Sequence, residues 1–252
     1  MEYISLTQSN ISTEHICCAI SDRKCKESYE AKKSWLANEL SKGYEFIRLN
    51  ERAKVLIEFG PAESSWLPIK ANNYLALGCF WVSGKYKGVG HGKQLLNKVK
   101  LAAEKLGKSG LVTVVGRKKK GFMSDTNWLK KQGFSICDEA PNDFVLLCLP
   151  LNTEREQPRF LPHVQSPRIE FNGCVAFYSN RCPFSEHHVL NSLVESCKKR
   201  DIPLKIIKLD TLEKAQNCPS PATIFSLYYR GCFVTTDISA CMDTRFDKYI
   251  KE

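Results

Sequence analysis

Residues 75–96, with the sequence LALGCFWVSGKYKGVGHGKQLL, decide the fold of this chain. The apolar, aromatic run from Leu75 to Val82 predicts a buried strand. The glycine-rich turn Lys87–Gly92 follows, and its glycines let the backbone approach a ligand closely. After the turn, apolar residues recur at helical spacing, at Leu95, Val99, Ala102 and Leu106. A glycine turn that opens a helix presents free N–H groups and a partial positive charge, so this stretch predicts a pyrophosphate cradle.

Two common phosphate-binding loops do not fit this turn. A Walker A loop requires Ser or Thr where this chain has Gln94, and a glycine five positions before Gly92, where it has Lys87. A dinucleotide fingerprint requires G-x-G-x-x-G, whereas glycines 88, 90 and 92 alternate here and no acidic strand end follows about twenty residues later. We therefore expect a different phosphorylated ligand.

Basic residues gather around the same turn. The chain has 252 residues and a net charge of +10. Between Lys85 and Lys131 lie 13 Lys and Arg and only two acidic residues, Glu104 and Asp125, so this segment carries +11 and the remainder is near −1. Such a surface suits a polyanion, either nucleic acid or a phosphorylated cofactor. No helix-turn-helix, RRM or KH signature is present, so we expect the cofactor and no nucleic acid.

The overall composition is that of a soluble globular protein, with 43% hydrophobic and 25% charged residues. No apolar run is long enough for a membrane span, and the N-terminus lacks a basic region followed by an apolar run. We therefore expect a cytoplasmic protein with no signal peptide and no membrane partner. The 12 cysteines include no C-x-x-C pair and the histidines lack zinc-finger spacing, which favours reduced thiols and no metal.

Residues 1–150 mix helical and strand-like patterns and predict one α+β domain. Helices are expected at 11–20, 29–40 and 124–132, with Asp22 and Ser28 as caps of the first two elements. Strands are expected at 45–50, 54–59, 75–82, 111–115, 134–137 and 144–149. Residues 151–167 contain three of the eleven prolines and little periodicity, which indicates an interdomain linker.

Residues 168–252 predict a second, smaller α/β domain with the element order β-α-β-α-β-β-α. Its strands are expected at 174–178, 204–209, 222–229 and 232–236, and its helices at 183–199, 212–216 and 244–251.

The N-terminal 150 residues resemble the GNAT (Gcn5-related) N-acetyltransferases. The family motif R/Q-x-x-G-x-G/A is matched by Lys87-x-x-Gly90-x-Gly92, with lysine as the one departure. Residues 57–69 (IEFGPAESSWLPI) and 79–88 (CFWVSGKYKG) look like the YoaP-type branch, which carries an extra C-terminal domain. The resemblance implies a mixed, mostly antiparallel sheet with a splayed strand and flanking helices. It also implies acetyl-CoA as co-substrate and transfer of its acetyl group to an amine.

The same resemblance implies a set of cofactor contacts. Backbone amides from Val89 to Lys93 would bind the pyrophosphate, and strand residues Cys79–Val82 would pair with the pantetheine arm. Arg117–Lys120 would reach the 3′-phosphate, unless these charges are simply solvated. The residues expected to bind the cofactor are Cys79, Phe80, Trp81, Val82, Lys87, Gly88, Val89, Gly90, His91, Gly92, Lys93, Asn127 and Lys130.

Acetyl transfer to a primary amine by direct attack requires a base and a donor to the leaving thiolate. Glu58, in an apolar strand, and Glu63, in a loop, are the two candidate carboxylate bases. Ser124 or Asn127 can donate a hydrogen bond to the thiolate, because Leu129 occupies the position where many family members carry a tyrosine acid. A strand amide is expected to stabilise the oxyanion.

Two tryptophans lie close to these candidates. Trp66 and Trp81 are candidates for the acceptor pocket, although core packing is expected for Trp81. The acceptor amine itself stays open, and a homodimer is one possible assembly.

The C-terminal element order resembles a thioredoxin or glutaredoxin fold. Residues Ser179–Ser185 (SNRCPFS) resemble the one-cysteine glutaredoxin site, in which Cys182 would be the thiol and Ser185 replaces the resolving cysteine. Pro221 stands where this fold places a cis-proline. A helix N-terminus and Arg181 would lower the pKa of the thiol. The alternative hypothesis is therefore a CoA-binding protein whose C-terminal monothiol domain has a redox or binding role, against an inert scaffold that shapes substrate access.

Overall fold

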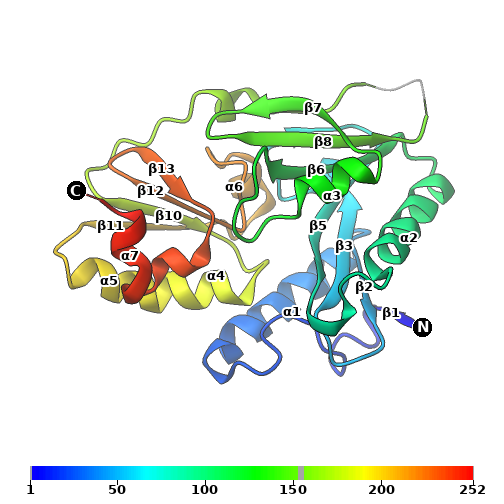
Figure 1. Ribbon diagram of the computed structural model, residues 1–252, viewed down its shortest axis with the longest axis horizontal. Helices are drawn as coiled ribbons and strands as arrows, with labels where there is room; N and C mark the ends of the chain where they lie inside the picture. The colour runs from blue at the N-terminus through cyan, green and yellow to red at the C-terminus, as the bar shows by residue number, and fades with distance from the viewer. Residues whose placement is uncertain (1, 153–155, 252) are drawn as a thin grey trace.

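The computed structural model describes residues 2–152 and 156–251 (Figure 1). The N-terminal part, residues 2–150, is built on a seven-stranded sheet with the strand order β1-β2-β3-β5-β6-β8-β7. Every adjacent pair is antiparallel except β5 and β6, which run parallel. The strands are β1 (Tyr3–Ser5), β2 (Glu45–Leu49), β3 (Val55–Pro61), β5 (Tyr74–Val82), β6 (Gly110–Gly116), β7 (Ser135–Ala140) and β8 (Phe144–Pro150).

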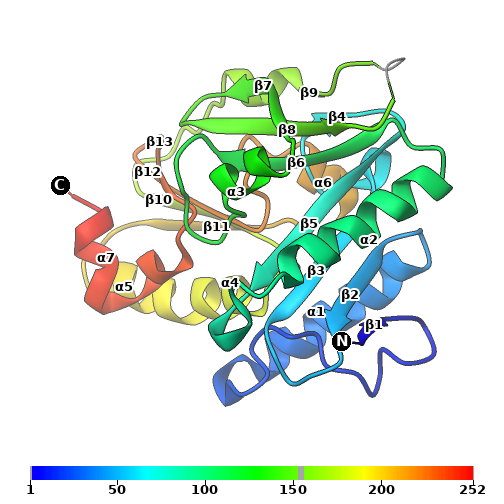
Figure 2. The same ribbon diagram turned by 45° about the vertical axis from the view of Figure 1, so that its right-hand side comes forward.

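Helices cover both faces of this sheet (Figure 2). They are α1 (Lys26–Leu40), α2 (His91–Lys105) and α3 (Thr126–Lys131), with short 3-10 helices at Arg23–Cys25, Ala62–Ser64 and Gly84–Tyr86. Side chains point alternately to the two faces of the sheet along each strand, so neighbouring residues pack against different helices. Phe46 packs in the cluster that contains Leu36 of α1, and Ile47 packs in the cluster that contains Val99 of α2. The sheet is therefore buried on both sides.

The parallel strands β5 and β6 part after three residues. Their pairing runs from Tyr74 opposite Gly110 to Ala76 opposite Val112 and then stops. Strand β5 continues to Val82 and stays paired with β3 along its other edge. From Leu77 onward its edge toward β6 is therefore open, which is the splayed strand that the resemblance implied.

The expected helix at 11–20 is wrong. This segment is a series of turns, because Cys17 and Ala19 adopt left-handed φ values of 63° and 53°, which no α-helix accommodates. The next helix, α1, begins at Lys26, so Ser28 lies inside it and caps nothing. Asp22 caps the preceding 3-10 turn by accepting a hydrogen bond from the N–H of Lys24.

The C-terminal part, residues 168–251, contains a four-stranded sheet with the order β11-β10-β12-β13. Strands β10 and β11 are parallel, and the other two pairs are antiparallel. The strands are β10 (Cys174–Tyr178), β11 (Leu204–Lys208), β12 (Phe225–Tyr229) and β13 (Cys232–Thr235). The expected element order is therefore observed.

Helices flank this second sheet. The helix expected at 183–199 consists of α4 (Pro183–His187), a π-helical segment (His188–Leu193) and α5 (Val194–Lys198) in direct succession. The others are α6 (Leu212–Gln216), α7 (Asp243–Tyr249) and a 3-10 turn at Ile238–Cys241.

The segment expected to be a linker contains ordered structure. Its strand β9 (Arg159–Phe160) pairs with β4 (Ile69–Lys70), with Phe160 opposite Ile69. A 3-10 helix at Pro162–Gln165 follows, and residues 153–155 lie outside the described ranges. The residues between the two sheets therefore include a short strand and a 3-10 helix, and their role as an interdomain linker stays a prediction.

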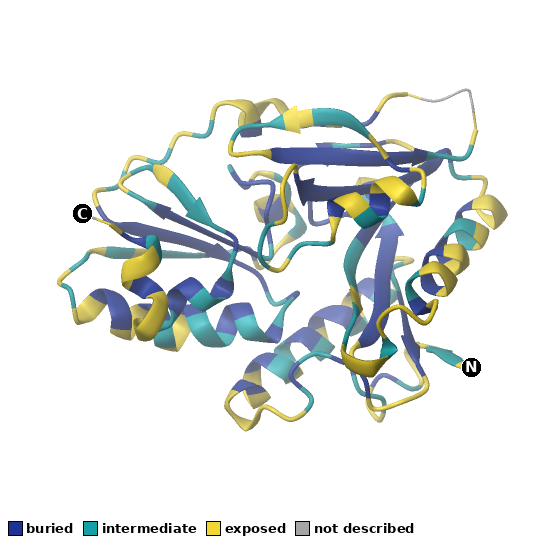
Figure 3. Ribbon diagram, viewed as in Figure 1, coloured by how far each residue is buried: buried dark blue, intermediate teal, exposed yellow. Residues whose placement is uncertain are grey.

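The two sheets share one continuous buried cluster. Phe177 and Tyr228 of the C-terminal part pack in the same cluster as Trp35 and Trp66 of the N-terminal part. Hydrogen bonds cross the same boundary: for example, Thr223 Oγ1 donates to the carbonyl of Trp66 at 2.5 Å, and Thr236 Oγ1 donates to that of Gly121 at 2.7 Å. Figure 3 shows buried residues on both sides of this junction. The C-terminal part is thus packed against the N-terminal part rather than tethered to it.

None of the helices within the described ranges has the length and apolar character that crossing a membrane requires. All twelve cysteines are free thiols. No cluster of three or more potential metal ligands is present among the described residues.

Candidate active site

The glycine turn has the geometry of an anion cradle. Gly88 and Gly90 have φ values of 77° and 96°, which side-chain-bearing residues rarely adopt. Gly90 immediately precedes α2. Among the described residues, the N–H groups from Val89 to Lys93 have no hydrogen-bond acceptor. Five consecutive free donors at the positive end of a helix form the binding surface that a pyrophosphate requires.

Aromatic packing fixes the start of α2. His91 is 1% exposed, and its Nδ1 lies 2.7 Å from the hydroxyl of Tyr3. A Cβ at Gly92 would lie 3.0 Å from the ring of Trp128, which also packs edge-on against Phe80 of β5. Strand β5, α2 and α3 are therefore held in one fixed arrangement around the turn. The side chains of Lys87 and Lys93 are exposed beside it.

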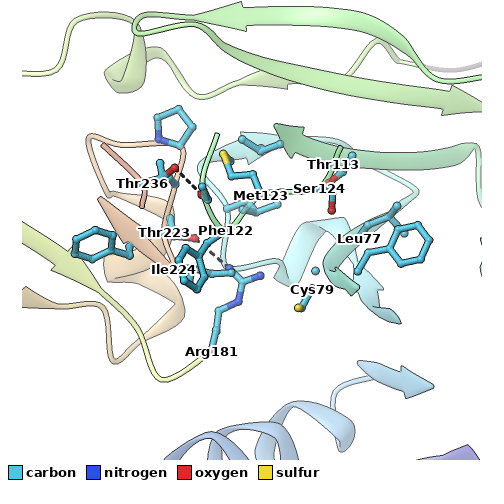
Figure 4. A pocket seen from close by; sticks show the side chains of 18 of the residues that line it. Leu77, Cys79, Thr113, Phe122, Met123, Ser124, Arg181, Thr223, Ile224 and Thr236 are labelled. Atoms are coloured by element: carbon cyan, nitrogen blue, oxygen red, sulfur yellow. Dashed lines mark hydrogen bonds between the residues drawn. The ribbon is translucent and has the colours of Figure 1, made fainter. Parts of the chain in front are cut away.

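A pocket opens where β5 leaves β6 (Figure 4). One wall is the splayed part of β5, and a second is the loop between β6 and α3. The third wall belongs to the C-terminal part, from the loops before α4 and before β12. The residues that carry the argument below are Leu67, Cys79, Phe122, Met123, Arg181 and Thr223.

A β-bulge shapes the floor of this pocket. Ile57 pairs with Phe80 and Phe59 pairs with Leu77, so the single residue Glu58 faces two residues of β5, Gly78 and Cys79. A bulge turns backbone groups away from the ladder. This one lies in the ladder between β5 and β3, in the stretch of β5 whose other edge, toward β6, is open.

Glu58 is held by two partners beneath the bulge. Its side chain is 1% exposed, and Lys32 Nζ donates to Oε1 at 2.5 Å. The hydroxyl of Tyr44 donates to Oε2 at 3.0 Å. Tyr44 itself lines a smaller cavity beside Gly78 and Arg181. Burial and the adjacent Glu58 carboxylate raise the pKa of Tyr44 well above its usual value, so its hydroxyl stays protonated.

Glu63, the other expected base, lies outside the pocket. Its carboxylate accepts a hydrogen bond from the N–H of Asn73 at 2.6 Å, and its side chain is exposed. Its carbonyl accepts a hydrogen bond from Gln216. A catalytic role for Glu63 stays a prediction, and its position favours a structural one.

The candidate donors to the leaving thiolate are separated. Ser124 lines the pocket, whereas Asn127 and Lys130 project from α3 into solvent. Leu129 is fully buried in the core beneath α3. The hydroxyl of Ser124 is thus the only one of the expected donors that the structure places on the pocket wall among the described residues.

The expected core role of Trp81 is wrong. Its side chain is 45% exposed and lines the pocket, because β5 has no neighbour on that edge. Trp66 has the opposite placement: it is buried between α1 and the C-terminal part.

Two of the four basic residues at positions 117–120 already have partners within the protein. Arg117 forms an ion pair with Glu139. Lys120 lies over the ring of Phe144, and burial lowers its pKa. Lys118 and Lys119 are exposed and free to meet a phosphate.

The pKa of Cys182, the possible reactive thiol, is raised rather than lowered as expected. Burial raises the pKa of Cys182 to about 11, although Lys32 and two nearby N–H groups act in the opposite direction. The proline prediction is also wrong: no peptide bond among the described residues is cis, and Pro221 is therefore trans. Pro221 instead lines the pocket beside β5.

Sequence reasoning missed Lys32, Tyr44 and Cys18, and it gave Arg181 only an accessory role. Lys32 lies on the buried face of α1, four residues before Leu36. A lysine on the apolar face of a helix could have indicated a buried charge. No local pattern marks the others, because their partners are distant in sequence.

Comparisons with known proteins show to which family this chain is related. A family model described as YoaP-like matches residues 203–248. The chain is 38% identical over 250 residues to a Bacillus subtilis (strain 168) protein named Uncharacterized N-acetyltransferase YoaP, covering 99% of this chain and 98% of that protein.

Solved structures are similar at lower identity. PaiA N-acetyltransferase of Thermoplasma acidophilum, in complex with coenzyme A, is 16% identical with a TM-score of 0.42, over 60% of this chain and 99% of that one. A GNAT family acetyltransferase of Brucella melitensis, in complex with acetyl-CoA, is 17% identical with a TM-score of 0.37, over 62% and 91% of the two chains. Because these TM-scores are below 0.5, the family relationship of the chain rests on its identity to the Bacillus subtilis protein.

Proposed function

The chain belongs to the YoaP-type N-acetyltransferases and is thus an acetyl-CoA-dependent enzyme, and from that premise we propose how it works. Acetyl-CoA binds along β5 and the glycine turn, and a primary amine enters the pocket and attacks the thioester directly. The observation that carries the proposal is the run of free N–H groups from Val89 to Lys93 at the start of α2.

The cofactor has a continuous path across the site. The pyrophosphate binds the free N–H groups, where Lys87 and Lys93 add positive charge. The pantetheine arm lies along the open edge of β5 from Leu77 to Val82 and pairs with its backbone. This path leads the thioester to the bulge at Gly78 and Cys79, next to the pocket.

The chemistry follows from the residues around the bulge. The amine nitrogen forms a bond to the acetyl carbon, and the carbon–sulfur bond breaks. An amide of the bulge stabilises the oxyanion. The proton of the amine passes to the hydroxyl of Tyr44 while Tyr44 gives its own proton to Glu58, 3.0 Å away. CoA leaves as a thiolate that accepts a hydrogen bond from Ser124.

The C-terminal part supports the same proposal. We divide the chain at 1–150, 151–167 and 168–252 and assign the last segment a thioredoxin-like fold, because its strand order and directions fit that topology. Its loops form a wall of the acetyltransferase pocket. A separate monothiol reaction is not favoured, because the pKa of Cys182, near 11, leaves little thiolate at neutral pH.

A matched pair of glycine variants tests cofactor binding. Gly90 and Gly107 both have left-handed φ values, 96° and 62°, and flank the same helix. Alanine at either position costs a similar backbone strain, but only at position 90 does the methyl group enter the proposed cradle. Saturating acetyl-CoA at 100 times its dissociation constant should stabilise the wild type by about 2.7 kcal/mol.

We expect the Gly107→Ala variant to keep that shift and the Gly90→Ala variant to lose most of it. Formation of an N-acetylated amine is then followed by mass spectrometry with a broad set of primary amines. Absence of a thermal shift in the wild-type protein would contradict the proposed function.

A further inference from the structure

Arg181 is a buried cation without an anionic partner. Its side chain lies just before α4 and is 6% exposed. Its Nη1 donates to the carbonyl of Trp66 at 3.2 Å and to Thr223 Oγ1 at 3.0 Å. Its Nε has no partner, and no ion pair among the described residues involves this guanidinium.

The surrounding charges leave this cation uncompensated. The buried carboxylate of Glu58, in the same region, is already paired with Lys32 and accepts a hydrogen bond from Tyr44. The aromatic ring of Trp35 lies 5.9 Å from the guanidinium carbon and supplies only weak attraction. The buried side chains of Lys32, Glu58 and Arg181 therefore sum to one positive charge as long as the neighbouring Cys18 is a neutral thiol. A buried unpaired charge is strongly unfavourable, so the arrangement is completed by an anion from outside.

One edge of the Arg181 guanidinium is free of hydrogen bonds to the described residues. Neither Nε nor Nη2 makes a hydrogen bond to the described residues, and these two nitrogens form the edge that binds a carboxylate with two parallel bonds. Arg181 lines both the main pocket and the smaller cavity behind it. In Figure 4 it approaches from the C-terminal part and is joined to Thr223, with Cys79 of β5 across the pocket.

Two further polar groups in the smaller cavity lack partners. The Oγ of Ser65 and the indole N–H of Trp66 are buried and unbonded, and both residues line that cavity together with Arg181. Both groups can donate a hydrogen bond to an anion. Buried polar groups without partners are rare in folded proteins, and here they surround one cation.

We propose that Arg181 binds the carboxylate of the acceptor, so that the substrate is an amine that also carries a carboxylate, such as an amino acid. This rests on the proposed function, since the amine must reach the thioester at the bulge. The carboxylate lies against Arg181, which places the amine on the side of Cys79 and Tyr44. The apolar side chains of Leu67, Phe122 and Met123 line other parts of the main pocket and favour an acceptor with an apolar side chain.

A carboxylate fits better than a phosphate. One planar fork with two free nitrogens matches two carboxylate oxygens, whereas a phosphate offers a third oxygen and more charge than this single cation neutralises. No lysine lines either cavity.

The test compares apolar L-amino acids with their amides, which differ only in the carboxylate. Rates of N-acetylated product are measured by mass spectrometry and corrected for the fraction of neutral amine. We expect the wild-type kcat/KM to favour the acids by roughly 10- to 100-fold, the range for a charged hydrogen-bonded pair. The Arg181→Met variant should lose this preference, because its kcat/KM falls far more with the acids than with the amides. The Arg181→Lys variant should keep part of it, because it retains the charge without the fork.

An exposed arginine of the same part serves as the control: the Arg168→Met variant should behave as the wild type. Equal wild-type rates for acids and amides, or an equal loss for both in Arg181→Met, would overturn the inference. Preference for O-phosphoethanolamine over the acids would overturn it in favour of a phosphate.

A failure of the proposed function gives a different result. If acetyl-CoA binds but no amine is acetylated, calorimetric titration of the CoA-bound protein with N-acetyl amino acids and their amides still decides the question. Tighter binding of the acids, lost in Arg181→Met, supports the carboxylate site, and equal binding rejects it.

Discussion

The ammonium group of Lys32 lies 2.5 Å from the carboxylate of Glu58, with 0% and 1% of the two side chains exposed. The contact joins α1 to β3, directly beneath the bulge of β5. Burial is the largest single influence and acts to lower the pKa of Lys32, but Glu58, Cys18 and Cys79 together hold this pKa well above its usual value. The ammonium group of Lys32 thus stays charged and holds the carboxylate of Glu58 below the proposed site of acetyl transfer.

Removing one partner of this ion pair should destabilise the fold. The Lys32→Met variant leaves the carboxylate of Glu58 buried without its cation, which typically costs about 3–5 kcal/mol. Urea unfolding followed by tryptophan fluorescence measures the free energy. The Lys214→Met variant, which breaks the exposed pair with Asp210, should cost below about 1 kcal/mol. Equal, small costs in both variants would contradict the ion pair's role.

The proposed proton relay places Tyr44 between the amine and Glu58. The Tyr44→Phe variant removes the hydroxyl that donates to Glu58 at 3.0 Å, without adding volume. We expect kcat to fall roughly 100-fold, with the KM for acetyl-CoA unchanged. The Tyr29→Phe control removes a half-buried hydroxyl that accepts from the N–H of Ile16, outside both cavities, and should keep the wild-type rate. Wild-type kcat in Tyr44→Phe would exclude the relay.

The parts that sequence predicted are those that local patterns determine. Strand β5, the glycine turn and α2 were expected because their apolar spacing and their glycines lie in one continuous stretch, residues 74–105. The helix at 11–20 failed because left-handed residues at Cys17 and Ala19 have no dependable sequence signal. The pocket wall was not predictable either, since Thr223 meets Trp66 across 157 positions. A predicted appendage thus became part of the site only through tertiary packing.

The thiol of Cys18 should react with alkylating reagents at a lower pH than an ordinary cysteine. A hydrogen bond from Cys79 and the charge of Lys32 lower its pKa to about 7, although burial opposes the shift. Labelling with iodoacetamide, followed by mass spectrometry from pH 5.5 to 9, should show its rate rising through pH 7. In the Cys79→Ala variant this rise should move to higher pH, and the exposed Cys232 serves as internal reference.

The same shift has a consequence for stability. The folded-state pKa of Cys18 is below the unfolded value of about 8.5. Its contribution is therefore complete above pH 8.5 and is lost as the pH falls through 7. An unchanged pH profile of Cys18 labelling after removal of the Cys79 thiol would contradict the hydrogen bond between them.

Ser124 is proposed to stabilise the leaving thiolate. The Ser124→Ala variant removes its hydroxyl from the pocket wall and should lower kcat roughly 10-fold by loss of one hydrogen bond to a charged group. The KM for acetyl-CoA should not change, because the thioester of the bound substrate carries no charge on sulfur. The Ser135→Ala variant, at an exposed strand position, is the control. A rise in KM with kcat unchanged would instead make Ser124 a simple binding residue.

A tyrosine at position 129 should not restore a missing acid. Leu129 is buried in the core, with 0% of its surface exposed to solvent, and it does not line the pocket. A larger, polar ring there overpacks the core beneath α3, which typically costs about 1–3 kcal/mol, and buries a hydroxyl without a partner. We therefore expect the Leu129→Tyr variant to unfold at lower urea concentration and to gain no activity. Higher kcat in this variant would mean that position 129 faces the leaving thiolate, and Ser124 would then lose its proposed role.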